Sequence, residues 1–219
     1  MKLSRADQIA ERLVREMRPY CERIEIAGSV RRRKVEVKDI EIVAVPKWDV
    51  PPVEEQVRLL FGSPPRSANA NTLHFWAMKL AGVRWIKPGT SQIVAWTPRP
   101  EGKYWRGLVP TSGDDPIKLD LFLAEPENFG LIYLIRTGAA EFSAAILGHA
   151  KNRTSYQTEK SYYEDRPELK GKPEGGWLVE KATGRRIEVR DERDVFELLG
   201  LQFVEPPLRI DGRAIRRKS

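Results

Sequence analysis

The segment Ile24–Pro46, IEIAGSVRRRKVEVKDIEIVAVP, reads as two short strands joined by a turn that contains a Gly-Ser pair and a cluster of arginines. Two carboxylates in the second strand, Asp39 and Glu41, are separated by a single isoleucine. Successive side chains of a strand point to opposite faces, so these two carboxylates share one face and the isoleucines share the other. The segment therefore predicts a strand with one acidic and one apolar face.

A third carboxylate, Asp120, lies at the centre of another predicted strand, residues 117–124, whose leucines face the other way. If the two strands are neighbours, three carboxylates converge, which is electrostatically costly unless cations lie among them. Oxygen-only ligands favour Mg²⁺ or Mn²⁺. Two such ions could activate a 3′-hydroxyl and stabilise a leaving pyrophosphate. The alternative is a solvated strand face whose carboxylates pair with nearby arginines.

The turn ahead of the acidic strand has features of a phosphate site. A strand that runs into Gly28-Ser29 and then into a helix start offers backbone N–H groups and a hydroxyl to a phosphate. The three arginines at 31–33 add charge suited to a triphosphate, because arginine binds phosphate in a forked geometry. The combination of this turn with the acidic strand favours a metal and phosphate site over a solvated face.

Bulk properties narrow the class of protein. The formal net charge of +7 favours an anionic partner. The single cysteine, Cys21, excludes an internal disulfide and fits a reducing compartment. No apolar run approaches the length that spans a membrane. We therefore expect a cytoplasmic protein without a membrane partner, and a monomer by default.

The periodicity of apolar residues predicts a mixed α+β fold in which a sheet is layered with helices. A change in character after Pro126 suggests two units, residues 1–130 and 131–219.

Four tryptophans between residues 76 and 105 are expected in the packed interior rather than stacked on bases. Residues 160–176 are expected to form a loop. The predicted helices are 4–17, 53–62, 72–82, 127–138, 140–153 and 191–200, and the predicted strands are 23–28, 39–46, 83–87, 91–97 and 117–124, with a hairpin over 176–189.

The ordered set of Gly28-Ser29, the arginines, Asp39-Ile-Glu41 and Asp120 resembles the nucleotidyltransferase fold, and within it the family X, polymerase beta-like DNA polymerases. The resemblance continues through 128–146, NFGLIYLIRTGAAEFSAAI, and 191–209, DERDVFELLGLQFVEPPLR. It spans most of residues 5–210, although 62–110 align poorly. It implies a minimal form of the family, with a palm sheet followed by a small α+β thumb, or nucleotide-binding, subdomain.

The resemblance also implies a role for individual residues. The three carboxylates would bind two Mg²⁺ ions, for which Mn²⁺ can substitute, and would carry the catalysis. The triphosphate would be bound by Gly28, Ser29, Arg32 and Lys38. The pocket for the sugar and base would be formed by Ile135, Arg136, Thr137, Gly138 and Ser143.

Three departures from the family pattern affect what is expected. Glu41 replaces an aspartate, and Lys38 replaces the usual glycine before the first acid. Ile135 and Arg136 replace the aromatic pair that crowds the sugar 2′ position in many family members. The hypothesis that follows is weak discrimination against ribonucleotides.

The sequence thus predicts a metal-dependent nucleotidyltransferase that adds nucleotides to a DNA primer 3′-hydroxyl with release of pyrophosphate. Its expected partners are nucleoside triphosphates and primer-template or gapped DNA, which suits template-directed gap filling in DNA repair. Two alternatives stay open. One is the same chemistry on another acceptor, such as a tRNA end, a protein or a small molecule, and the other is a non-catalytic nucleic-acid-binding module.

Overall fold

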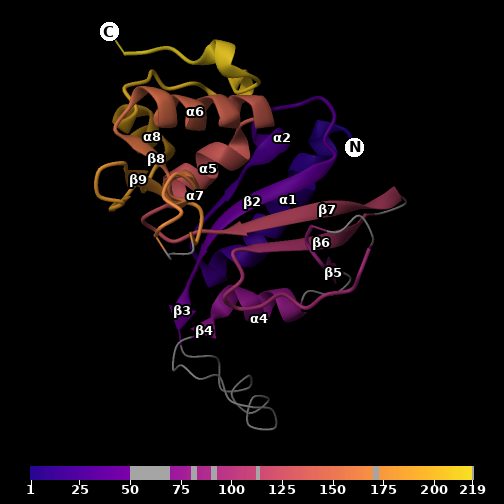
Figure 1. Cartoon of the computed structure of the whole chain (residues 1–219). Coiled ribbons are helices and arrows are strands. Elements are labelled where there is room, and N and C mark those ends of the chain that lie inside the picture. Colours follow the sequence, from indigo (N-terminus) through magenta and orange to yellow (C-terminus); the bar gives the residue numbers. More distant parts are fainter. Residues whose placement is uncertain (50–69, 80–82, 90–92, 112–113, 170–172, 219) are drawn as a thin grey trace.

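The computed structural model describes residues 1–49, 70–79, 83–89, 93–111, 114–169 and 173–218 (Figure 1). The helix predicted over 53–62 lies outside the described residues. A five-stranded sheet takes the first part of the chain, and a second group of helices with a three-stranded sheet follows it. The mixed α+β class predicted from the sequence is confirmed. The expected boundary between residues 130 and 131 falls in the first turn of α5 (Phe129–Thr137).

The larger sheet has the strand order β1-β2-β7-β6-β5. β2 and β7 are parallel, and the other neighbouring pairs are antiparallel. The two strands that carry the predicted acids are therefore direct neighbours. The strand bounds are β1 (Cys21–Ile26), β2 (Asp39–Pro46), β5 (Arg84–Ile86), β6 (Tyr104–Thr111) and β7 (Asp114–Leu123).

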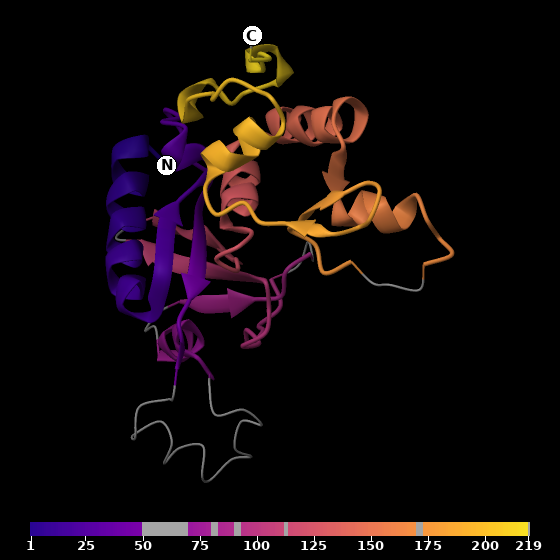
Figure 2. The same cartoon turned by 90° about the vertical axis from the view of Figure 1, so that its left-hand side faces the viewer.

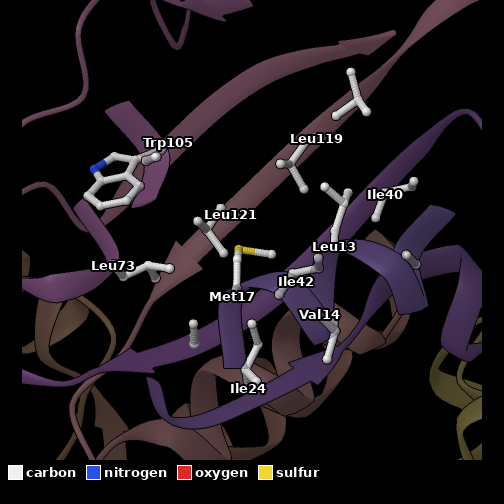
Figure 3. Packing of buried hydrophobic residues seen from close by; sticks show 14 of the residues in the cluster. Leu13, Val14, Met17, Ile24, Ile40, Ile42, Leu73, Trp105, Leu119 and Leu121 are labelled. Atoms are coloured by element: carbon white, nitrogen blue, oxygen red, sulfur yellow. The ribbon is translucent and has the colours of Figure 1, made fainter. Parts of the chain in front are cut away.

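Helix α1 (Leu3–Met17) covers one face of this sheet. Figure 3 shows Leu13 and Met17 of the helix against Ile42 and Leu121 of the two central strands. All four side chains are at most 1% exposed, and burial of this kind contributes about 1.5–3 kcal/mol for each large apolar side chain. This face holds the main hydrophobic core.

Helix α5 covers the opposite face. Its Phe129 and Tyr133 pack against Val43 and Val45 of β2 and Phe122 of β7. Figure 2 shows α1 and α5 on opposite sides of the sheet. Because alternate residues of β2 share a face, the odd-numbered acids Asp39 and Glu41 lie on the α5 side.

The C-terminal part has a core of its own, built from α5, α6, α8 and the small sheet β10-β9-β8. The break between α5 and α6 falls at Gly138, as the sequence predicted. The bounds are α6 (Ala140–Arg153), β8 (Tyr156–Thr158), α7 (Glu159–Glu164), β9 (Leu178–Glu180), β10 (Arg186–Ile187) and α8 (Glu192–Leu198). The shorter elements elsewhere are η1 (Arg18–Tyr20), α2 (Gly28–Arg31), β3 (Trp48–Asp49), β4 (Ala70–Asn71), α4 (Thr72–Lys79), η2 (Pro206–Leu208) and η3 (Gly212–Ala214).

Several sequence-based expectations need correction. The strand expected over 91–97 is reduced, in its described residues, to an isolated bridge between Ala95 and Ile86. Strand β6 was not predicted, although it is the antiparallel neighbour of β7. The loop expected over 160–176 begins within helix α7.

Trp76, Trp85 and Trp105 are buried in the core, as expected. Of the helices that the structure describes, none is both long and apolar enough to span a membrane.

Candidate active site

The acids of β2 and β7 meet across a parallel strand pair. In this pair, Glu41 lies opposite Asp120, and Asp39 lies opposite Lys118. Ile40 and Ile42 point into the α1 core and are fully buried, which turns the acids to the α5 face. The apolar residues of β2 thus fix the direction of its acidic residues, and strand pairing adds Asp120.

The carboxylates raise one another's proton affinity. Burial, followed by the charges of Asp39 and Asp120, raises the pKa of Glu41 to about 7. Burial and the charge of Asp120 also raise the pKa of Asp39. The guanidinium groups of Arg32 and Arg136 act against the shift of Glu41. The site therefore favours extra positive charge, from protons or from cations.

Asp120 is already engaged by the neighbouring strand β6. Arg106 lies opposite it in register and donates from Nε to Oδ1 at 2.6 Å and from Nη2 to Oδ2 at 2.8 Å. The hydroxyl of Tyr104 donates to Oδ1 at 2.6 Å. Within the described ranges, no three His, Cys, Asp or Glu side chains are grouped closely enough to hold a metal ion.

The donor set nevertheless fits magnesium in the type of its ligands, although the three side chains are not grouped around one point. All three side chains offer oxygen, on adjacent strands of one sheet face, and the two acids of β2 carry raised pKa values that a cation would reverse. Asp39, Glu41 and Asp120 are the residues that would hold the ions. Asp120 would first have to release part of its contacts with β6.

Gly28-Ser29 lies directly beside Glu41. Gly28 has a φ of 61°, in the left-handed region that favours glycine, and a Cβ there would collide with the Glu41 carboxylate. The buried hydroxyl of Ser29 has no hydrogen-bond partner among the described residues. Buried polar groups are almost always hydrogen-bonded, so this hydroxyl lacks the partner that such groups usually have.

The three arginines after this turn have different partners. Arg31 forms an ion pair with Glu192 and donates to the Thr137 hydroxyl at 2.8 Å. Arg32 donates to the Thr137 carbonyl at 2.5 Å, and the charges of Glu41 and Asp39 act on it. Arg33 forms an exposed ion pair with Asp7 at 3.2 Å. Of the predicted triphosphate residues, Gly28 lies against Glu41, and Arg32 is close enough to Glu41 and Asp39 for their charges to act on it. Ser29 follows Gly28 in α2, whereas Lys38 is exposed immediately before β2.

The residues predicted for the sugar and base pocket occupy the break between α5 and α6. The Ser143 hydroxyl donates to the Ile135 carbonyl at 2.8 Å. The Ile135 side chain packs against the C-terminal core, and the Arg136 guanidinium lies 3.9 Å from the centre of the Phe122 ring. Thr137 is fully buried beneath Arg31 and Arg32. Strand β7 therefore approaches the break through Phe122, two residues after Asp120.

Residues 132–210 match the family model of the DNA polymerase beta thumb. The chain carries a family X polymerase-like thumb. For these residues it confirms the resemblance inferred from the sequence, and the match includes the α5–α6 break, helix α8 and Arg209. A comparison with curated proteins finds no match to the chain.

Four residues beside the site were not among those predicted. Tyr104 and Arg106 lie on β6, which the sequence reasoning missed as a strand. The other two, Glu192 and Arg209, form a buried ion pair in the thumb, with Arg209 Nη1 and Glu192 Oε2 2.6 Å apart. The alternation of residues 104–109, in which Tyr104 and Arg106 share one face, was the signal available for the first two.

Proposed function

We propose that this protein is a metal-dependent nucleotidyltransferase that extends a DNA primer 3′-hydroxyl with release of pyrophosphate, as a template-directed gap-filling polymerase in repair. One observation carries the proposal: Glu41 and Asp120 lie opposite each other in a parallel strand pair, on the face shared by Asp39 and next to Gly28 of the Gly-Ser turn. The polymerase beta thumb supports DNA as the acceptor.

Each part of the site has a role in this proposal. Asp39, Glu41 and Asp120 would hold two Mg²⁺ ions, which when bound supply activation of the 3′-hydroxyl and neutralise the leaving pyrophosphate. Ser29 and Arg32 would bind the triphosphate, with a hydroxyl and a guanidinium. Held near the acids, they would orient the reacting phosphate relative to the primer end, and such positioning contributes much of the catalysis in phosphoryl transfer.

The test is extension of a primer on one-nucleotide-gapped and open-template DNA, with Mg²⁺ or Mn²⁺ and single nucleotides. We expect templated addition by the native protein and a loss of at least about a thousandfold in Asp120→Ala. The matched control is Asp115→Ala, because Asp115 is an exposed carboxylate on the same strand, outside the site. Equal activity of the native protein and Asp120→Ala would refute the proposal.

The same assay separates the alternatives. Pyrophosphate release that requires a tRNA end, a protein or a small molecule would keep the chemistry and replace the acceptor. DNA binding without pyrophosphate release, for every acceptor and metal, would favour a non-catalytic nucleic-acid-binding module. The unpartnered Ser29 hydroxyl and the presence of all three acids support a catalytic function over a purely binding one.

A further inference from the structure

Arg106 lies beside the site, and the proposed function assigns it no role. Its guanidinium bridges both oxygens of Asp120, at 2.6 and 2.8 Å, and the Tyr104 hydroxyl adds a third hydrogen bond at 2.6 Å. A carboxylate offers about four acceptor positions. Most of the acceptor capacity of Asp120 is therefore taken by the protein itself.

The contact between Arg106 and Asp120 is held in place by the surrounding structure and is not a loose surface ion pair. The Asp120 side chain is 7% exposed and that of Arg106 is 28% exposed. The Tyr104 ring stacks on Phe122 with centroids 4.8 Å apart and an angle of 8° between the rings. Arg106 lies on one side of this stack, 5.6 Å from the centre of the Tyr104 ring, and Arg136 lies over Phe122. Strand register and aromatic stacking thus hold Arg106 against Asp120.

The arrangement has a consequence for cation binding. Arg106 supplies positive charge to one member of the acid cluster, as a divalent ion would, and it contacts the oxygens that such an ion needs. We propose that Arg106 is the resident counter-cation of Asp120, and that a divalent ion binds this carboxylate only by displacing the guanidinium. The inference rests on the proposed function, because it takes Asp120 as a metal ligand. It makes Arg106 a positioning residue that lowers the metal affinity of the substrate-free protein.

The test is Mn²⁺ binding by the full chain without DNA or nucleotide, measured from the electron paramagnetic resonance signal of free Mn²⁺ at pH 8. Arg106→Met is expected to bind Mn²⁺ roughly tenfold more tightly than the native protein, because hydrogen bonds between charged groups are worth about that factor or more. The matched control is Lys118→Met, which removes an exposed cation opposite Asp39 without touching Asp120. Its affinity is expected to change less than about threefold.

An unchanged or weaker affinity in Arg106→Met overturns the inference, as does an equal gain in Lys118→Met. Tyr104→Phe provides a second route should Arg106→Met fail to fold. It keeps the ring stacked on Phe122 and removes one donor to Asp120, so a gain of a few-fold is expected. An unchanged or weaker affinity in a folded Tyr104→Phe variant also overturns the inference.

Asp120→Ala distinguishes a failure of the proposed metal site from a failure of the role of Arg106 alone. If it binds Mn²⁺ as tightly as the native protein, Asp120 is not a ligand, and the metal site of the proposed function fails together with the inference. If Asp120→Ala loses binding while Arg106→Met gains none, the metal site stands and only the role of Arg106 is refuted.

Discussion

Glu192 in α8 forms a two-pronged ion pair with Arg31 in α2, with Arg31 Nη1 2.8 Å from Oε2 and Nη2 2.5 Å from Oε1. Arg209, which is fully buried, donates to Oε2 at 2.6 Å. Arg31 also donates to Thr137 beside the helix break. One buried carboxylate of the thumb therefore connects the turn after β1, the α5–α6 break and the segment after α8.

Removal of the Glu192 charge is expected to destabilise the protein by about 3 kcal/mol or more, because it leaves buried Arg209 without its counter-charge. Glu192→Gln keeps the shape of the side chain and isolates the charge. The measurement is urea denaturation at pH 7. The control is Glu197→Gln in the same helix, whose exposed ion pair with Lys218 spans 3.8 Å and contributes about 1 kcal/mol at most. Equal costs for the two variants would contradict the prediction.

The same ion pair makes stability depend on pH. Burial alone would raise the pKa of Glu192, but hydrogen bonds and charge from Arg31 and Arg209 outweigh burial and hold the pKa below its usual range. A carboxyl whose pKa is lower in the folded state contributes its stability above the unfolded-state pKa, about 4.3 for glutamate, and loses it as the pH falls through the folded-state value.

We therefore expect the free energy of unfolding of the native protein to fall more steeply below about pH 4.3 than that of Glu192→Gln. The measurement is urea denaturation from pH 7 to pH 3 for both proteins. Because all other carboxyls are shared, the difference between the two curves reports Glu192. Parallel curves would show that the pKa of this residue is not lowered in the folded state.

The parts of the fold that local sequence determines were predictable. Alternation placed Asp39 and Glu41 on one face of β2, and the leucines beside Asp120 marked β7 as a buried strand. The α8 cap was equally local: the Asp191 side chain accepts from the backbone N–H of Arg193, and Asp194 accepts from that of Asp191. These features depend on residues within a few positions of one another.

The missed parts depend on contacts distant in sequence. Arg106 meets Asp120 only because β6 pairs with β7 in one register, and a slip of one residue would turn it to the other face. In the sequence Glu192 looks like an ordinary acid in the first turn of a helix, since its partners, Arg31 and the buried Arg209, are 161 and 17 residues away. Sequence alone does not distinguish a buried charge from a solvated one.

Gly28→Ala is expected to impair the acid cluster. The φ of 61° strains any side chain by roughly 1–2 kcal/mol, and the added Cβ would push the Glu41 carboxylate away. We expect reduced Mn²⁺ affinity and reduced primer extension. Gly148→Ala in α6 is the matched control, since a Cβ there would meet no heavy atom of the described residues within 4 Å outside its own turns of helix.

The control variant Gly148→Ala should be more stable than the native protein by about 0.5–1 kcal/mol, because alanine is the better helix former. Its Mn²⁺ affinity should equal that of the native protein. Normal Mn²⁺ binding by a folded Gly28→Ala variant would show that Glu41 does not need the space above Gly28.

Weak selection against ribonucleotides is the last prediction. Ile135 packs into the thumb core and Arg136 lies over Phe122, so neither position offers an aromatic ring to the sugar. A pocket without a dedicated steric barrier rejects an added hydroxyl by about a hundredfold at most. We expect discrimination below that value in single-turnover insertion with Mg²⁺, measured as the ratio of insertion efficiencies for matched deoxyribo- and ribonucleotides.

Arg136→Phe should raise this ratio, because it places a ring beside the proposed sugar position. Arg136→Met removes the guanidinium without adding a ring, so it separates the effect of ring size from that of lost charge. An equal rise in both variants would assign the effect to charge. Discrimination of several thousandfold by the native protein would contradict the prediction outright, because it would require a barrier to the 2′-hydroxyl that Ile135 and Arg136 do not provide.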